Sequence, residues 1–70
     1  MANTGAKDVR SRADTHLADG LKQAWAGNLD EAIAAFDRAI AVAPDLSVAY
    51  LNRGIAYDRQ GDRARAIADL

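Results

Sequence analysis

Apolar side chains recur at helical spacing along most of the chain. Leu17, Leu21 and Trp25 follow one another at intervals of four residues, which places them on one face of a helix. Gly27 ends this helix, because glycine readily adopts the left-handed conformation found at helix ends. Residues 1 to about 10 are small, polar and without a period, so they are interpreted as a frayed lead-in.

A second helix follows the glycine. Asn28 stands three residues before Glu31, which is the spacing of a capping box at a helix start. Pro44 ends this helix, because the residue before a proline avoids the helical conformation. The predicted apolar stripe of the second helix consists of Ala32, Ile33, Phe36, Ala39, Ile40 and Ala43.

A third helix is predicted from about Leu46 to Gln60. Its predicted apolar set consists of Tyr50, Leu51, Gly54, Ile55 and Tyr57. Gly61 closes this helix, and Asp62 caps a fourth one that continues to Leu70. The sequence shows helical spacing and no strand pattern, so it predicts an all-α fold.

Two ten-residue stretches resemble each other at a distance of 34 residues. GNLDEAIAAF at 27–36 returns as GDRARAIADL at 61–70. A fixed period of this length indicates one helical hairpin used again, with each copy burying a face on the next. Two pairs of small residues stand where the helices of a hairpin are expected to approach closely, namely Gly20 with Ala32 and Gly54 with Ala66.

Both copies of the hairpin resemble a tetratricopeptide repeat. The stretch SVAYLNRGIAYDRQGDRARAIADL at 47–70 matches the family signature at Tyr50, Gly54, Tyr57, Gly61, Ala66 and Leu70. Residues 13–46 match a whole repeat at Gly20, Gly27, Ala32, Phe36, Ala39 and Pro44. The resemblance implies antiparallel hairpins stacked as a right-handed solenoid fragment, with a protein or peptide partner on the concave face. Catalysis, a cofactor and a small-molecule substrate are not expected.

The resemblance also divides the chain. Residues 1–12 are expected to be a flexible or helix-extending lead-in, 13–46 the first hairpin, and 47–70 a second hairpin truncated in its last helix. An apolar self-association edge would then face a missing neighbour, formed by Ala66, Ile67 and Leu70. Two explanations stay open: the chain is the N-terminal piece of a longer repeat array, or the edge is buried against another copy, most simply in a homodimer.

The first helix of each hairpin lines the concave face in the resembled family. This implies a partner-binding set of Asp14, Leu17, Leu21, Trp25, Val48, Leu51, Asn52, Ile55 and Arg59. Tryptophan and arginine are the residue types that most often dominate interface energies. The alternative is that Leu17, Leu21 and Trp25 simply cover the helices. A carboxylate clamp of the kind some family members have is not expected, because Asp14 stands where a lysine would be needed.

Polar residues break the family pattern in the first helix. His16, Asp19 and Gln23 stand where the family has large apolar residues, between the first two helices. Burying each of them without a partner would cost about 1–3 kcal/mol. Arg53 replaces a leucine-like residue and matches Asp19 across the repeat, so an Asp19–Arg53 ion pair between neighbouring hairpins is one candidate pairing.

Composition excludes several other functions. The net charge of -1, with acidic and basic residues interspersed, lacks the clustered basic surface of a nucleic-acid-binding protein. A chain with no cysteine and one histidine, His16, does not supply the usual zinc ligands. No apolar run approaches the ~20 residues that cross a bilayer, and MANTGAKDVR lacks the apolar core of a signal peptide. We therefore expect a cytoplasmic, non-enzymatic interaction module without nucleic-acid or membrane partners.

Overall fold

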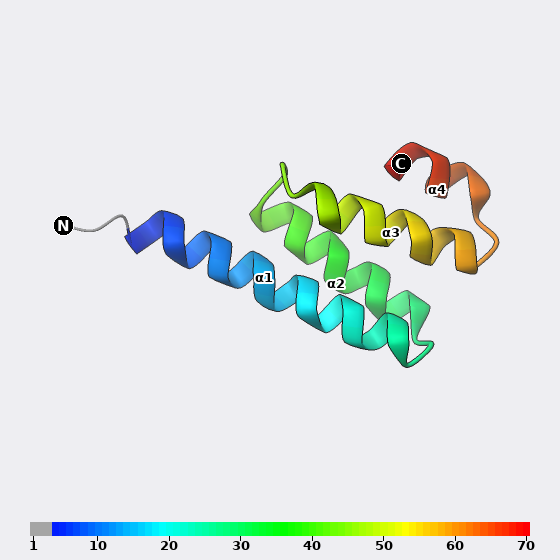
Figure 1. Cartoon of the computed structure of the whole chain (residues 1–70), viewed down its shortest axis with the longest axis horizontal. Helices are drawn as coiled ribbons and strands as arrows, with labels where there is room; N and C mark the ends of the chain where they lie inside the picture. The colour runs from blue at the N-terminus through cyan, green and yellow to red at the C-terminus, as the bar shows by residue number, and fades with distance from the viewer. Residues whose placement is uncertain (1–3) are drawn as a thin grey trace.

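The computed structural model describes residues 4–70, which form four helices and the loops between them. Helix α1 spans Thr4–Trp25, α2 spans Leu29–Val42, α3 spans Ser47–Arg59 and α4 spans Arg63–Asp69. Each helix runs antiparallel to the one before it and packs against it, and α2 lies between α1 and α3 (Figure 1). The all-α fold of helical hairpins predicted from the sequence is thus confirmed.

The turns after α1 and α3 are built in the same way. Gly27 and Gly61 both have a φ angle of 85°, the left-handed conformation that glycine adopts without steric cost. The amide of Asn28 donates to the carbonyl five residues back at 2.9 Å, and the amide of Asp62 makes the same bond at 2.9 Å. This is the hydrogen bond of a Schellman motif. The two similar stretches that begin at Gly27 and Gly61 therefore begin with the same helix-ending motif.

The starts of the two helices that follow these turns differ. The Asp62 side chain accepts a hydrogen bond from the amide of Arg65 at 3.2 Å, which is the predicted cap of α4. The capping box predicted from Asn28 and Glu31 was wrong, because the Asn28 side chain makes no cap hydrogen bond. Its Nδ2 donates instead to Oε1 of Gln23 at 3.0 Å. The last turn of α1 thus supplies a competing acceptor, and Asn28 ties α1 to the turn.

The core is thin and centred on α2. Phe36 is the one large side chain among the described residues that is fully buried, at 0% exposed. The other buried apolar residues are mostly alanine: Ala13, Ala32, Ile33, Ala35, Ala39, Ala49, Ala56 and Ala66. Alanine removes little apolar area from water, so the stability of this core depends on how closely the helices approach.

Helices α1 and α2 approach each other closely at Gly20. A Cβ placed on Gly20 would lie 2.6 Å from Cδ1 and 3.0 Å from Cζ of Phe36, so the ring packs directly on the bare backbone of α1. The predicted close approach of the two helices at Gly20 is confirmed, with the three nearest atoms all from Phe36, and its pairing with Ala32 stays a prediction. The second pairing is confirmed, since a Cβ on Gly54 would lie 3.2 Å from the carbonyl oxygen of Ala66.

Helix α3 buries only part of the predicted face, since Gly54 is buried and Tyr57 packs partly buried against the core. Of the predicted apolar set only Gly54 is buried, and its buried neighbours on α3 are Ala49 and Ala56. Leu51 and Ile55 are 49% and 46% exposed. Because each residue turns a helix by about 100°, these two side chains lie on the face away from Ala49. The larger apolar side chains of α3 are therefore left on an open surface.

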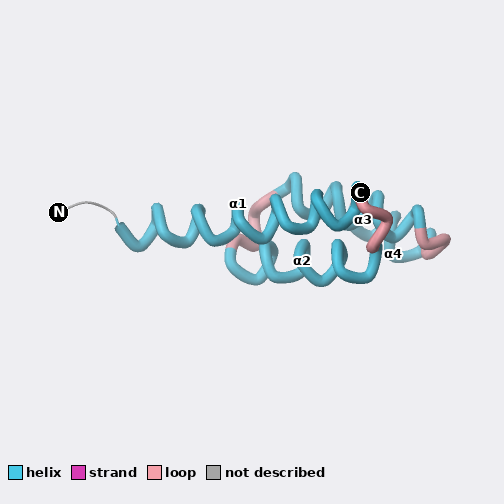
Figure 2. Tube along the Cα trace, turned by 90° about the horizontal axis from the view of Figure 1, so that it is seen from below, coloured by secondary structure: helices cyan, strands magenta, loops and turns pink. Residues whose placement is uncertain are grey.

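Helix α1 is longer than its partner helices. It has 22 residues against 14 in α2, and its N-terminal part extends beyond the end of α2 (Figures 1 and 2). The frayed lead-in expected up to about residue 10 is helical from Thr4 onward, and residues 1–3 lie outside the described part of the chain. None of the helices formed by residues 4–70 combines the length and the hydrophobicity needed to cross a membrane.

The contact of Phe36 with Gly20 predicts the effect of a single methyl group. Gly20→Ala should lower the free energy of unfolding by about 1–3 kcal/mol, because overpacking outweighs the better helix propensity of alanine. Urea unfolding followed by circular dichroism measures this change.

A double-mutant cycle with Phe36→Leu provides the control. In the Phe36→Leu background the smaller, flexible side chain leaves room at Gly20, so the added methyl should cost much less. Stabilisation by Gly20→Ala alone would contradict the close packing.

Candidate functional site

A groove lies between the C-terminal halves of α1 and α3 and has a volume of about 320 Å³. Its lining consists of Leu21, Ala24, Trp25, Phe36, Asn52, Ile55, Ala56 and Arg59. The volume is near the lower end of the roughly 300–1,000 Å³ of small-molecule pockets. Because the groove is also open to solvent, it fits side chains of a larger partner better than it fits an enclosed small molecule.

The apolar residues of this face differ in how far the fold itself uses them. Leu17 and Leu21 are partly buried and pack against the core cluster, as the covering interpretation expects. Trp25 is 88% exposed, so its indole ring covers almost nothing within the chain. Val48 on α3 is also exposed, and it continues the apolar face formed by Leu51 and Ile55. Trp25 and the α3 residues therefore remain available to a partner.

The two polar side chains of the lining are held by backbone carbonyls. Nη1 of Arg59 donates to the carbonyl oxygen of Ala24 at 3.0 Å, which joins the end of α3 to the last turn of α1. Nδ2 of Asn52 donates to the carbonyl oxygen of Val48 at 2.8 Å within α3. Both side chains are thus fixed at the groove before any partner arrives.

Asp14 lies apart from this groove. It lines a second hollow, between the N-terminal half of α1 and the loop from α2 to α3, with Val9, Arg10, Ala13, Val42, Ala43, Pro44, Asp45 and Leu46. The structure therefore gathers most of the predicted concave set around Trp25, and it places Asp14 near the middle of α1, in the lining of the other hollow.

Comparison with known proteins supplies the family. The family model described as "TPR repeat" matches residues 26–61, and the chain is 45% identical over 51 residues to tetratricopeptide repeat protein 36 of Mus musculus. The chain belongs to the tetratricopeptide repeat (TPR) family. The match covers 73% of the chain and 27% of the mouse protein, so the chain spans about a quarter of the length of that relative. No solved structure matches the chain.

The family assignment has a general functional meaning. TPR repeats generally mediate protein–protein interaction, and proteins of the family are typically non-enzymatic scaffolds. The resemblance inferred from the glycine, alanine and aromatic positions is thereby confirmed.

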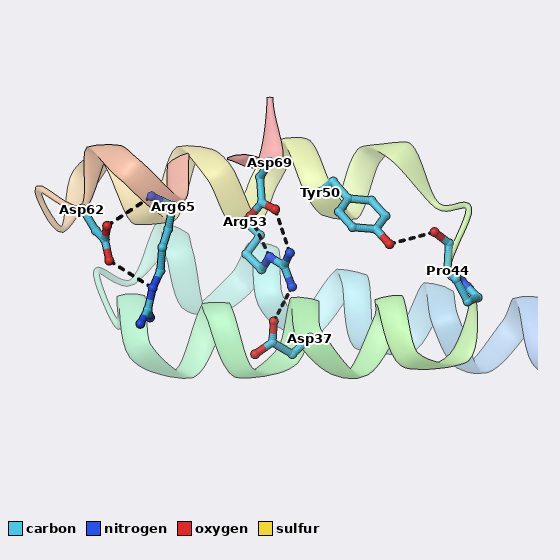
Figure 3. A network of polar contacts seen from close by, with 7 residues as sticks. All are labelled: Asp37, Pro44, Tyr50, Arg53, Asp62, Arg65 and Asp69. Carbon is cyan, nitrogen blue, oxygen red and sulfur yellow. Dashed lines mark hydrogen bonds and ion pairs between the residues drawn. The ribbon is translucent and has the colours of Figure 1, made fainter. Parts of the chain in front are cut away.

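Arg53 joins three helices of the TPR chain (Figure 3). Its Nε and Nη2 each donate to one carboxylate oxygen of Asp69 on α4 at 2.7 Å, and its Nη1 donates to Asp37 on α2 at 2.8 Å. The Asp69 side chain is only 7% exposed, so this bidentate pair is nearly shielded from water. The hydrogen bond to the Asp69 carboxylate raises the pKa of Arg53 above its ordinary value, against an opposing effect of burial.

The predicted ion pair between Asp19 and Arg53 is absent from the described residues. Oδ2 of Asp19 lies 3.4 Å from Nη2 of Arg38, and Arg53 binds Asp37 and Asp69. The reason is the position of α2 between α1 and α3. Asp37 and Arg38 are adjacent residues of α2. Arg38 pairs with Asp19 of α1, and Asp37 pairs with Arg53 of α3.

The polar residues of α1 are also less buried than predicted. His16, Asp19 and Gln23 are each only partly buried, and no buried side-chain nitrogen or oxygen of the described residues lacks a hydrogen-bond partner, so the three incur no unpaired burial. The positions of α1 that are buried are Ala13 and Gly20, seven residues apart on one face. The three polar residues lie to the side of that face and keep contact with water.

Tyrosine rings lie beside the arginine network. The guanidinium of Arg53 is 5.4 Å from the ring centroid of Tyr50 and 6.0 Å from that of Tyr57, and Arg65 is 5.7 Å from the same Tyr57 ring. The hydroxyl of Tyr50 donates to the carbonyl oxygen of Pro44 at 2.8 Å, which fastens α3 to the preceding loop (Figure 3). The two Arg53 contacts lie within α3, whereas the contact of Arg65 with Tyr57 adds to the attraction between α3 and α4.

The predicted self-association edge is only partly exposed. Ile67 and Leu70 are 68% and 73% exposed, and they border a hollow that Gly54, Ile55, Asp58, Arg63 and Ala66 also line. Ala66 is 2% exposed, so its assignment to the exposed edge was wrong. Its backbone packs against Gly54 of α3, which covers the small side chain.

Two features of this site were missed in the sequence. Phe36 was expected in the core, but it also forms part of the groove lining. The contact of Arg59 with Ala24 brings together residues 35 positions apart, and no local pattern marks it. The repeat offset of 34 residues would have placed Arg59 beside Trp25, its counterpart in the first hairpin.

The Arg53 network predicts a large loss of stability on removal of the cation. Arg53→Met should lower the free energy of unfolding by about 3 kcal/mol, because it leaves the nearly buried Asp69 carboxylate without its partner. Urea unfolding followed by circular dichroism is the measurement.

Two further variants test the explanation. Asp37→Asn should cost less than about 1 kcal/mol, because that carboxylate is half exposed. Arg53→Met combined with Asp69→Leu should recover most of the loss, since no buried charge then remains. An equal cost for Asp37→Asn and Arg53→Met would contradict the dominant role of Asp69.

Proposed function

We propose that the TPR chain binds a peptide or a partner helix in the groove between α1 and α3. The contact is made by Trp25 and Leu21 from α1 and by Leu51, Asn52 and Ile55 from α3. Leu17, Val48 and Arg59 extend the surface along both helices. Protein–protein interaction is the general role of TPR repeats, and the groove is the specific surface that we assign to it.

The near-complete exposure of Trp25 carries this proposal. A tryptophan that is 88% exposed contributes little to the fold, yet it stands in the lining of an apolar groove. Tryptophan is enriched among the residues that dominate interface energies when they become buried. Leu51 and Ile55 add about half of their surfaces to the same face, and their burial by a partner would be favourable at ~25 cal/mol per Å².

Charged substitutions on α3 test the groove. Leu51→Glu with Ile55→Glu should abolish binding of peptides selected on the 70-residue chain from a displayed library, because two carboxylates would then be desolvated in the interface. Binding is measured by the change in Trp25 fluorescence, and circular dichroism should show unchanged helicity because both positions are half exposed.

Ile67→Glu with Leu70→Glu is the matched control, since it places the same two charges on exposed positions at the C-terminal end of the chain. This variant should bind the selected peptides like the parent chain. Equal binding by the parent and the Leu51/Ile55 double variant would refute the groove assignment.

A second candidate function is self-association through α4. The exposed Ile67 and Leu70 border a hollow that also contains one acidic and one basic residue, Asp58 and Arg63. Such a surface is complementary to a second copy of itself, because a two-fold contact would bring each Asp58 near the Arg63 of the other copy. This reading makes the TPR chain a structural module that buries its own apolar edge.

Dilution distinguishes this second function. A dimer should show a melting temperature that rises with protein concentration and a doubled mass in sedimentation equilibrium. Ile67→Glu should abolish both effects, whereas the groove variant Leu51→Glu should leave them unchanged. A melting temperature that stays constant over a hundredfold dilution would exclude self-association.

A further inference from the structure

Arg59 brings a charge into the groove that the chain itself does not neutralise. Among the described residues that line the groove, it is the one that carries a formal charge. The ion pairs found in the described part of the chain involve Arg38, Arg53 and Arg65, and Arg59 takes part in none of them. Its cation is therefore available to a carboxylate from outside the chain.

One hydrogen bond within the chain orients this cation. The hydrogen bond from Nη1 to the carbonyl of Ala24 holds the guanidinium at the end of the groove, in the same lining as Trp25 and Ile55. Guanidinium has five N–H donors in a planar fork, so several stay free after this bond. The fork matches the two oxygens of a carboxylate, and a low-polarity surrounding strengthens the resulting hydrogen bonds.

We propose that the groove recognises an acidic side chain, aspartate or glutamate, that stands next to a large apolar residue of the partner. The apolar residue packs on Trp25, Leu21 and Ile55, and the carboxylate binds the guanidinium of Arg59. The inference rests on the proposed function, because it names the partner chemistry of the same groove.

The geometry favours a side-chain carboxylate over the terminal carboxylate of a partner chain. Asn52, the other polar residue of the lining, precedes Arg59 by seven residues, or ~10.5 Å along the helix, so the two do not converge on one group. Its Nδ2 already donates to the carbonyl of Val48.

Three matched probe peptides test the proposal. Each is a 16-residue amphipathic helix, acetylated and amidated, with one identical stripe of leucines. The four positions that border the stripe are glutamate in the first peptide, glutamine in the second and lysine in the third. Binding is measured by titrations followed by Trp25 fluorescence. They are done at physiological ionic strength, where salt screens charge interactions beyond about 8 Å. The net charge of -1 on the chain does not by itself favour the glutamate peptide.

The glutamate peptide should bind about tenfold more tightly than the glutamine peptide, as expected for a charge-assisted hydrogen bond. Arg59→Gln should remove this preference, so that the glutamate and glutamine peptides bind this variant with equal affinity. Arg59→Glu should reverse the preference toward the lysine peptide. Arg12→Gln is the control of equal charge change, because Arg12 is exposed on α1 outside the groove lining, and it should keep the preference for glutamate.

The outcomes separate the two proposals. Equal affinity for the glutamate and glutamine peptides, or a preference that survives Arg59→Gln, would overturn the acidic-partner inference and leave the groove intact. Absence of binding by all three peptides would count against the groove itself. Preferential binding of the lysine peptide by the parent chain would overturn the inference directly.

Discussion

The packing of the Phe36 ring on the bare backbone of Gly20 is the contact on which the rest of the structure depends. Phe36 is the one large side chain that the described fold buries completely, and most of its buried neighbours are alanines. A core of such small side chains gains stability only if the helix backbones come close together. Gly20 permits that approach between α1 and α2, and Gly54 permits it between α3 and α4. The fold is thus stabilised by close contact between helix backbones, where other cores rely on the volume of large side chains.

The small residues at the helix–helix contacts also explain why the groove is apolar. Because alanine and glycine occupy the contacts between helices, the larger side chains of α1 and α3 are displaced to the open faces of these helices. Trp25, Leu51 and Ile55 are the clearest cases. Their exposure to water is unfavourable for an isolated chain, but it leaves apolar surface that a partner can bury. The thin core and the apolar groove are therefore two results of one distribution of residue sizes.

The sequence predicted those features that depend on local backbone chemistry or on the period. Gly27 and Gly61 adopt the positive φ that their turns require, and Asp62 caps α4. The predictions that failed concerned side chains with more than one partner within reach. The Asn28 side chain donates a hydrogen bond to Gln23 and does not cap its own helix, and Asp19 forms its ion pair with Arg38 and not with Arg53. A repeat offset gives the position of a residue along the solenoid, but it does not say which neighbouring helix offers the closest opposite charge.

Arg53 and Arg59 show how one residue type acquires two roles on a single helix. Arg53 faces α2 and α4, where Asp37 and Asp69 provide carboxylates, so its charge is used within the fold. Arg59 lies six residues later and faces the end of α1, where only a carbonyl oxygen is offered. A carbonyl orients the guanidinium without neutralising it. The difference between a structural and a recognition arginine on α3 thus comes from what the facing helix supplies.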